Sequence, residues 1–174
     1  MLIEVIDRDL IISELRSKDK EGVIREMASK FSQAGVVQNE DSFIKAIRTR
    51  EEIESTAIGS GIAIPHARSD TVEKLVVALG RSSAGLDFAS LDGKPVHLVF
   101  MIGCSSGETK TYLQVLARIA RLCKNKKMRE GLMNAKNVDA ILCFLKGFDI
   151  GSDRPEPVRL KDGRMIYPAA DNKK

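Results

Sequence analysis

The hydrophobic positions in the first third of the chain predict an edge strand and then two amphipathic helices. The strand is the short apolar run 10–12. The first helix follows Ser17 or Asp19, both suitable N-caps, and ends at Gly35, a natural C-terminal stop. Asn39 caps the second helix. Apolar residues recur every three or four positions in both helices: Val23, Ile24, Met27 and Phe31, then Phe43, Ile44 and Ile47.

Apolar runs in the middle of the chain predict the strands of a sheet. Two short runs flank the tight turn Gly59-Ser60-Gly61, and the second run stops at Pro65, which has no backbone donor. Residues 75–79 and 96–102 form longer runs, and the second of these is nearly all apolar, as in a central strand covered on both faces. The stretch 82–92 is predicted to be irregular.

The last third of the pattern predicts three helices and a C-terminal segment of different composition. A long helix over 108–124 has a wide apolar arc, a shorter helix covers 128–133, and Asn137 caps the last one. The arc of the long helix consists of Leu113, Leu116, Ile119, Ala120 and Cys123. Glycine and proline then become frequent, and two short strands flank Asp162-Gly163. We therefore divide the chain into a domain, 1–148, and a C-terminal extension, 149–174, with a short hairpin.

The order of these elements predicts the fold class. Strands and helices alternate loosely along 174 residues, a length that suits one ordinary domain. We expect an α/β fold with a single domain, in which a mixed parallel and antiparallel sheet is flanked by helices on both faces.

Composition and charge narrow the functional classes. The chain is 43% hydrophobic and 30% charged, and no run approaches the roughly 18 apolar residues of a membrane span. Acids stand near the N-terminus where a signal peptide needs a basic segment, so we predict a cytoplasmic protein that is not itself a membrane protein. The net charge of +4 is interleaved with acids and lacks interspersed aromatic residues, which argues against nucleic-acid binding.

The three cysteines, Cys104, Cys123 and Cys143, are widely spaced and form no CxxC pair. This spacing argues against a disulfide framework and against a zinc site. Because all three lie in apolar stretches, we expect buried, reduced thiols, and we predict no metal.

The candidate chemistry centres on His66, one of two histidines, which follows Pro65 directly. A histidine at this position is often only a polar residue at a strand end. Arg68 and Arg50 lie close in sequence, and both can converge on an anion. A neutral ring whose other nitrogen is held by an acceptor can attack phosphorus, and cations with N–H donors stabilise the transferred group. Donors offered by the flanking segment are Ser55, Thr56, Ser60 and Arg68.

Two motifs resemble a known family. The run Thr49-Arg50-Glu51-Glu52 and the following run from Ser55 to Arg68, with its Gly-Ile-Ala-Ile-Pro-His element, are similar to the enzyme IIA domain of the bacterial phosphoenolpyruvate-dependent phosphotransferase system. The matching branch is the mannitol/fructose type, which includes the nitrogen-regulatory proteins. Residues 91–96 and 113–122 also resemble this family, so that the similarity covers about residues 1–148.

The resemblance implies a role for each matching residue. His66 would be phosphorylated on Nε2 by the phosphocarrier HPr, and Arg50 would steady the phosphoryl group. The group would then pass to a IIB partner or serve as a regulatory signal, without a metal or organic cofactor. The protein would be a phosphoryl carrier rather than a stand-alone enzyme with multiple turnovers.

One position departs from the family. The family usually carries a second histidine immediately before the Leu-x-x-Leu pattern of the long helix, and here that residue is Tyr112. A tyrosine hydroxyl donates one hydrogen bond but carries no positive charge. The alternative is therefore a IIA-like regulatory binding module with impaired phosphotransfer. His97 is expected to be structural, Glu51 and Glu52 to form an exposed helix end, and Ser105, Ser106 and Thr109 to form a loop and cap that can also meet an anion.

Overall fold

The protein is built around one mixed sheet, seen in a computed structural model that describes residues 1–152, 158–159 and 165–166. The six-stranded sheet has the order β1-β5-β6-β3-β2, and β4 also pairs with β6. The β5–β6 and β2–β3 pairs are antiparallel, whereas β1–β5, β3–β6 and β4–β6 are parallel. The strands are β1 (Ile11–Ile12), β2 (Ala57–Gly59), β3 (Ile62–Ala63), β4 (His66–Arg68), β5 (Val76–Leu86) and β6 (Val96–Cys104).

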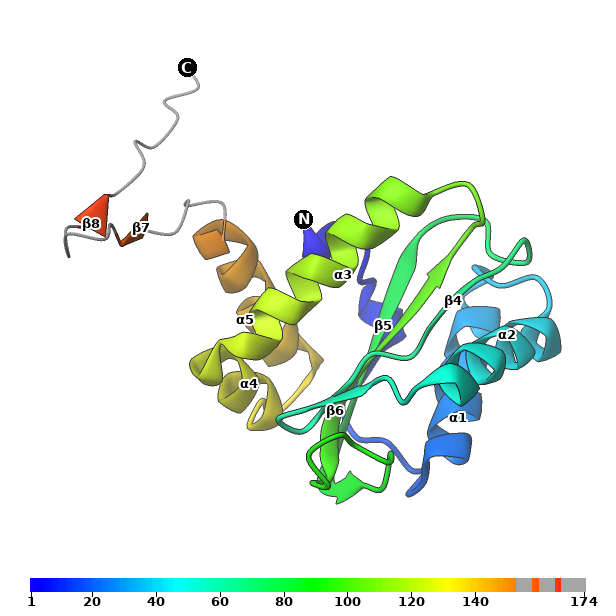
Figure 1. The fold of residues 1–174 in the computed structure, drawn as a ribbon, viewed down its shortest axis with the longest axis horizontal. Helices are drawn as coiled ribbons and strands as arrows, with labels where there is room; N and C mark the ends of the chain where they lie inside the picture. Colours follow the sequence, from blue (N-terminus) through cyan, green and yellow to red (C-terminus); the bar gives the residue numbers. More distant parts are fainter. Residues whose placement is uncertain (153–157, 160–164, 167–174) are drawn as a thin grey trace.

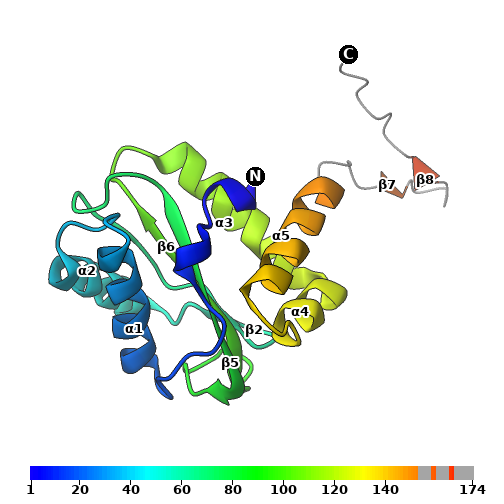
Figure 2. The same cartoon turned by 180° about the vertical axis from the view of Figure 1, so that it is seen from behind.

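Helices cover both faces of this sheet (Figures 1 and 2). On one face lie α1 (Lys20–Gln33) and α2 (Glu40–Ile53). On the other lie α3 (Thr109–Lys124), α4 (Lys126–Met133) and α5 (Val138–Ser152), together with the 3-10 helix η1 (Leu2–Glu4). A second 3-10 helix, η2 (Arg8–Leu10), leads into β1. Each face has its own hydrophobic cluster, so β6 is covered on both sides as its apolar sequence predicts.

The amphipathic pattern of α1 and α2 is confirmed. The apolar residues expected to face inward in both helices are buried against the sheet. Asp19, not Ser17, caps α1, because its carboxylate accepts from the Gly22 N–H at 2.9 Å. Asn39 caps α2 as predicted, accepting from the Ser42 N–H at 2.9 Å. The apolar spacing and the caps thus define these two helices locally.

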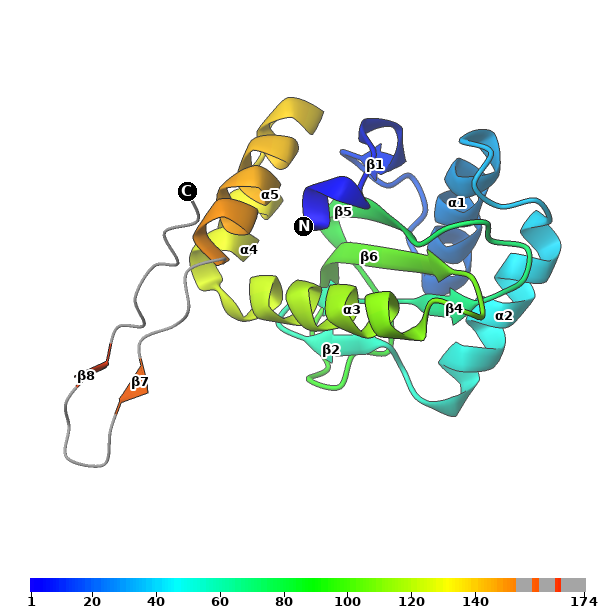
Figure 3. The ribbon, with the colours of Figure 1, turned by 90° about the horizontal axis from the view of Figure 1, so that it is seen from above.

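The chain does not leave the sheet at Pro65. β3 ends at Ala63, and after Ile64-Pro65 the chain pairs again with β6, where His66 lies opposite Ile102. Proline removes one backbone donor, but the Pro65 carbonyl still accepts from the Ile102 N–H at 2.9 Å. His66 is therefore the first residue of β4 rather than the end of the preceding strand. Viewed from above, β4 lies between α2 and the beginning of α3 (Figure 3).

Three other expectations need correction. The first part of the stretch predicted to be irregular is strand, because β5 continues to Leu86 with a register shift after Arg81, whereas 88–92 is loop and turn as expected. Leu113, expected in the buried arc of α3, is exposed, because the buried side of that helix is turned to carry Tyr112 instead. Cys143 is also exposed, whereas Cys104 and Cys123 are buried.

The described residues near the end of the chain lie on both sides of the boundary expected at residue 148. The helix α5 continues to Ser152, past residue 148. Two short strands, β7 (Val158–Arg159) and β8 (Met165–Ile166), pair antiparallel with Val158 opposite Ile166. The Asp162-Gly163 turn expected between them lies outside the described residues. Within the described ranges, no helix has the length and apolar content needed to cross a bilayer.

Candidate functional site

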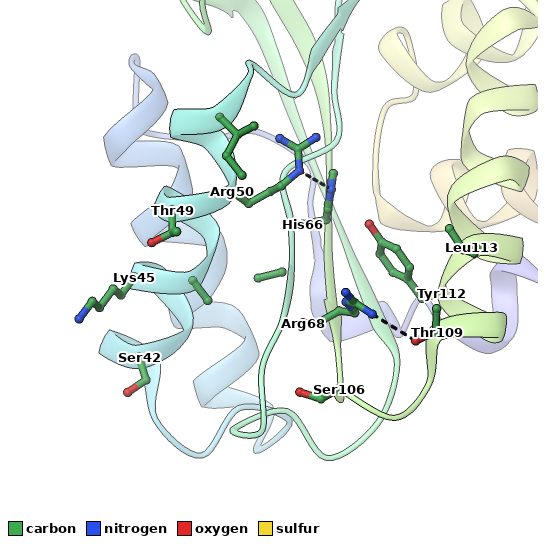
Figure 4. Close-up of a pocket in the computed structure, with 13 residues that line it drawn as sticks. Ser42, Lys45, Thr49, Arg50, His66, Arg68, Ser106, Thr109, Tyr112 and Leu113 are labelled. Atoms are coloured by element: carbon green, nitrogen blue, oxygen red, sulfur yellow. Dashed lines mark hydrogen bonds between the residues drawn. The ribbon is translucent and has the colours of Figure 1, made fainter.

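A cavity of about 870 Å³ opens at the sheet edge where β4 meets α2 and α3 (Figure 4). His66 and Arg68 enter it from β4, Arg50 from α2, and Tyr112 and Thr109 from α3. Four residues singled out from the sequence, Arg50, His66, Arg68 and Tyr112, are thus brought together. The structure therefore supports a single candidate site.

Both ring nitrogens of His66 have a partner. Nδ1 lies 2.7 Å from the backbone carbonyl oxygen of Ile64, which can only accept, so Nδ1 carries the proton. Nε2 accepts from Nε–H of Arg50 at 3.0 Å. A ring with this tautomer has its lone pair on Nε2, on the side of the cavity that Arg50 occupies. Nε2 is therefore the unprotonated nitrogen, and its lone pair accepts from Arg50 in this structure.

The pKa of His66 is lowered from its ordinary value near 6.5. Burial is the largest cause, since it penalises the charged ring, and the positive charge of Arg50 lowers the pKa further. The bond to the Ile64 carbonyl and the negative charge of Glu51 act in the opposite direction without reversing the shift. At neutral pH the ring is consequently uncharged and nucleophilic.

Arg68 is a second cationic group that lines the cavity. Nη1 of Arg68 donates to Oγ1 of Thr109 at 3.1 Å, which ties β4 to the first residue of α3 (Figure 4). The ring of Tyr112 packs beside His66, with 5.8 Å between the ring centroids and a tilt of 51°. Burial raises the pKa of the Tyr112 hydroxyl, so this group stays neutral and can act as a donor.

Three expected phosphate donors do not line the cavity. Ser55 donates to the Phe88 carbonyl at 3.2 Å, and Thr56 directs its hydroxyl and N–H to Glu51. Ser60 lies in the β2–β3 turn at φ +57, where its N–H donates to Asp92 at 2.9 Å. Ser55, Thr56 and Ser60 are therefore not among the residues that can donate to an anion in the cavity.

Glu51 was expected at an exposed helix end, but its side chain is only 7% exposed. Its carboxylate pairs with Nζ of Lys20 at 2.9 Å and accepts from Thr56. Glu52 is exposed as expected. Sequence reasoning missed this burial because Lys20, the partner, stands on a different helix.

The polar side of α2 that faces the cavity was also missed. It contributes Ser42, Lys45 and Thr49, which precede Arg50 at helical spacing. Because residues three and four apart share a helix face, placing Arg50 at the site would also have indicated Ala46 and Ile53. The helical spacing from Arg50 could therefore have identified this side of α2 from the sequence, although no charge run or motif pointed to it.

Residues outside the cavity have structural roles. Nδ1 of His97 lies 2.9 Å from the Ser82 carbonyl, at the beginning of β6. Glu108 rather than a serine stands at the N-cap position of α3, and its carboxylate accepts from the Leu75 N–H at 3.1 Å. In the part of the chain that the structure describes, no group of three or more His, Cys, Asp or Glu side chains is placed to hold a metal ion.

The protein has an α/β fold, and the cavity at the edge of its sheet is lined by a neutral histidine, two arginines and several hydroxyls. Such a site is suited to holding an anion. A family model described as "Phosphoenolpyruvate-dependent sugar phosphotransferase system, EIIA 2" matches residues 4–147. The chain therefore belongs to this family.

Two of the curated relatives carry names of different kinds. The "PTS system fructose-specific EIIABC component" of Bacillus subtilis (strain 168) is 39% identical over 148 residues, which cover 85% of this chain and 23% of that protein. The chain thus spans about a quarter of the length of the Bacillus protein. A "Nitrogen regulatory protein" of Bradyrhizobium diazoefficiens is 31% identical over 144 residues, covering 83% of this chain and 94% of that protein.

Solved structures agree with the fold. "Nitrogen Regulatory Protein IIA-Ntr" from Neisseria meningitidis superposes with a TM-score of 0.77 at 26% identity, covering 82% of this chain and 97% of that one. Enzyme IIA of mannitol from Escherichia coli, solved in complex with phosphorylated enzyme IIB, gives a TM-score of 0.70 at 25% identity, covering 80% and 95%. The single domain with a mixed, open sheet and helices on both faces is thereby confirmed.

Proposed function

We propose that the protein is a phosphohistidine carrier of the phosphoenolpyruvate-dependent phosphotransferase system. His66 accepts a phosphoryl group on Nε2 from an HPr-type phosphocarrier in the cytoplasm. The group then passes to a IIB partner or acts as a regulatory signal, as the names of the relatives suggest for the two branches. The observation that carries this proposal is the pair of hydrogen bonds made by the His66 ring. The bond to the Ile64 carbonyl holds the proton on Nδ1, and the bond from Arg50 requires the lone pair on Nε2.

The transfer step follows from this geometry. The lone pair of Nε2 forms the new bond to phosphorus, and the P–N bond of the donor breaks, leaving its electron pair on the donor nitrogen. Nδ1 keeps its proton and continues to donate to the Ile64 carbonyl, which stabilises the charge that the ring gains. The Arg50 N–H that now points at Nε2 has to turn onto a phosphoryl oxygen, where its charge stabilises the transferred group.

The test is phosphorylation of the whole chain by purified components. The protein is incubated with phosphoenolpyruvate, enzyme I and HPr, and its intact mass is measured under neutral or alkaline conditions. We expect the wild type to gain one phosphoryl group and His66→Ala to gain none. His97→Asn serves as the matched control, because it removes the other histidine, and it should still be phosphorylated. No gain on the wild type, or an unchanged gain on His66→Ala, would sink the proposal.

A second candidate function rests on Tyr112. This side chain stands beside His66 at the position of the usual second histidine, and it contributes no positive charge to the site. A IIA-like module that regulates a target by docking, with phosphotransfer impaired, is consistent with this substitution. The protein would then bind a partner without passing the phosphoryl group on efficiently.

Replacing Tyr112 distinguishes the two functions. If the missing histidine limits transfer, Tyr112→His should speed phosphoryl gain from HPr by about tenfold or more, since a positioned charge-assisted donor is stronger than a neutral one. Tyr112→Phe controls for the ring itself, because it keeps the packing on His66 and removes the hydroxyl. Equal rates for Tyr112→His and wild type would show that the substitution does not impair acceptance, and the docking interpretation would lose its support.

A further inference from the structure

A buried carboxylate lies directly behind the candidate site. Glu51 follows Arg50 on α2, yet its side chain turns away from the cavity and is 7% exposed. It accepts from the Thr56 hydroxyl at 2.6 Å and from the Thr56 N–H at 3.1 Å, and it pairs with Nζ of Lys20 on α1 at 2.9 Å. Three donors therefore fix a single carboxylate between two helices and the segment that leads into β2.

Thr56 continues the path toward the site through its backbone. Its side chain is bound to Glu51, and its carbonyl accepts from the Ile64 N–H at 3.0 Å. The carbonyl of Ile64 in turn accepts from Nδ1 of His66 at 2.7 Å. The sequence of bonds runs from Glu51 through Thr56 and Ile64 to His66.

The same anchor also fixes Arg50 from the other side. Arg50 and Glu51 are neighbours in the last turn of α2, and Nη1 of Arg50 donates to the Glu54 carbonyl at 3.1 Å. Holding Glu51 therefore restrains the helix end from which Arg50 reaches Nε2. The partner of Nδ1 is thus linked to Glu51 through hydrogen bonds, and the partner of Nε2 is linked to it through the backbone of α2.

We propose that Glu51 and Thr56 are positioning residues, which place the Ile64 carbonyl so that the proton of His66 stays on Nδ1. This proposal rests on the proposed function, and in it Glu51 and Thr56 keep Nε2 unprotonated so that it can accept the phosphoryl group. Neither residue touches the transferred group, and Thr56, at 4% exposure, is closed off from the cavity. Their buried polar bonds fit this task, because a satisfied network of this kind holds one geometry.

The sensitive measurement is the tautomer of His66, read from the ¹⁵N resonances of its ring in the whole chain. His97→Asn assigns the resonances, since it leaves a single histidine. In the wild type we expect the Nδ1–H form to dominate. Thr56→Val keeps the shape and removes the hydroxyl, and Glu51→Gln keeps the shape and removes the charge. Both should raise the Nε2–H fraction and slow phosphoryl gain from HPr by about tenfold, the size known for losing the outer partner of a metal-bound histidine, which is likewise held in one tautomer.

Two further variants separate positioning from general loss of structure. Thr56→Ser restores the hydroxyl and should restore both the tautomer and the rate. Thr71→Val is the matched control, because the Thr71 hydroxyl bonds only to Ser69 among the described contacts, outside the cavity lining. It should leave both readouts unchanged.

The possible results are distinct. Slower phosphoryl gain in Thr56→Val with an unchanged tautomer would overturn the inference, as would an unchanged tautomer in both main variants. A tautomer shift that Thr56→Ser reverses supports it. If the wild type itself gains no phosphoryl group, the proposed function fails, whereas the tautomer measurement still decides the positioning role because it requires no phosphoryl donor.

Discussion

At the scale of single residues, Arg50 has two opposing effects on His66. Its Nε–H occupies Nε2 in the resting site, and its charge helps to lower the pKa of the ring. The first effect blocks the nucleophile until the side chain turns, whereas the second keeps the ring neutral and therefore reactive. In the transfer that we propose, the same guanidinium then binds the phosphoryl group, so a single side chain would cover the nitrogen before transfer and stabilise the charge after it.

Removing the Arg50 charge should therefore raise the pKa of His66. In Arg50→Met the repulsion between two cations disappears, which favours the protonated ring. Phosphoryl acceptance should fall by about 100-fold at pH 8, the loss typical of one stabilising donor. It should fall further at pH 6, because more of the ring is then protonated. The ring resonances of His66, followed across a pH titration, give the pKa directly.

The matched control for this prediction is Arg48→Met. Arg48 lies one residue before Thr49 on the same helix, but it bonds to Glu21 of α1 and does not line the cavity. Its loss should leave the pKa of His66 and the rate of acceptance unchanged. A pKa of His66 that stays constant or falls in Arg50→Met would contradict the assigned electrostatic role.

At the scale of elements, two glycines show how context decides the effect of the same substitution. Gly85 lies in the irregular part of β5 at φ +84, and an added Cβ would come within 2.7 Å of Cβ of Pro95. Gly147 lies in the middle of α5, with open space around the position of a Cβ. The backbone of Gly85 and the rigid proline beside it leave no room, whereas Gly147 only weakens its helix.

Gly85→Ala and Gly147→Ala should consequently change stability in opposite directions. We expect Gly85→Ala to lower the free energy of unfolding by about 1–3 kcal/mol through strain and overpacking. Gly147→Ala should raise it by up to about 1 kcal/mol through helix propensity. Urea unfolding with an unchanged slope measures both. A rise in both variants would show that the register shift of β5 relaxes to admit a side chain, whereas a fall in both would contradict the effect of helix propensity expected at Gly147.

At the scale of the whole molecule, local patterns predicted the elements and the centre of the site, and contacts between distant residues account for what they missed. The spacing of apolar residues was enough for α1, α2 and β6, and the motif around His66 was enough to pair it with Arg50. The return of β4 to β6 after Pro65 depends on hydrogen bonds from another strand, which no local pattern contains. Thr56 was assigned to the phosphate for the same reason, since its actual partner Glu51 becomes visible only in three dimensions.

One contact between residues far apart in sequence joins the beginning of the described chain to α5. Asp149 on α5 is 1% exposed and accepts from the N–H groups of Leu2 and Ile3 at 3.0 and 2.8 Å. It also accepts from Nε of Arg118 on α3 at 2.8 Å. One carboxylate therefore holds η1, α3 and α5 together, and it lies just beyond residue 148, where the change in composition placed the end of the domain.

Two truncations test where the domain ends. A chain of residues 1–152 keeps the contacts of Asp149 with Leu2, Ile3 and Arg118, so we expect it to unfold at the same urea concentration as the full chain and to gain a phosphoryl group at the same rate. A chain of residues 1–148 removes Asp149, one buried partner of Arg118 and the acceptor of two backbone N–H groups, which should lower stability by about 3–5 kcal/mol. Asp149→Ala in the full chain separates the carboxylate from the rest of the lost turn and should account for most of that loss.

If instead 1–148 matches 1–152 in stability, the boundary drawn from composition is correct and the carboxylate is dispensable. If it does not, the last turn of α5 belongs to the domain, because a buried charge at its end holds the first residues of the chain in place.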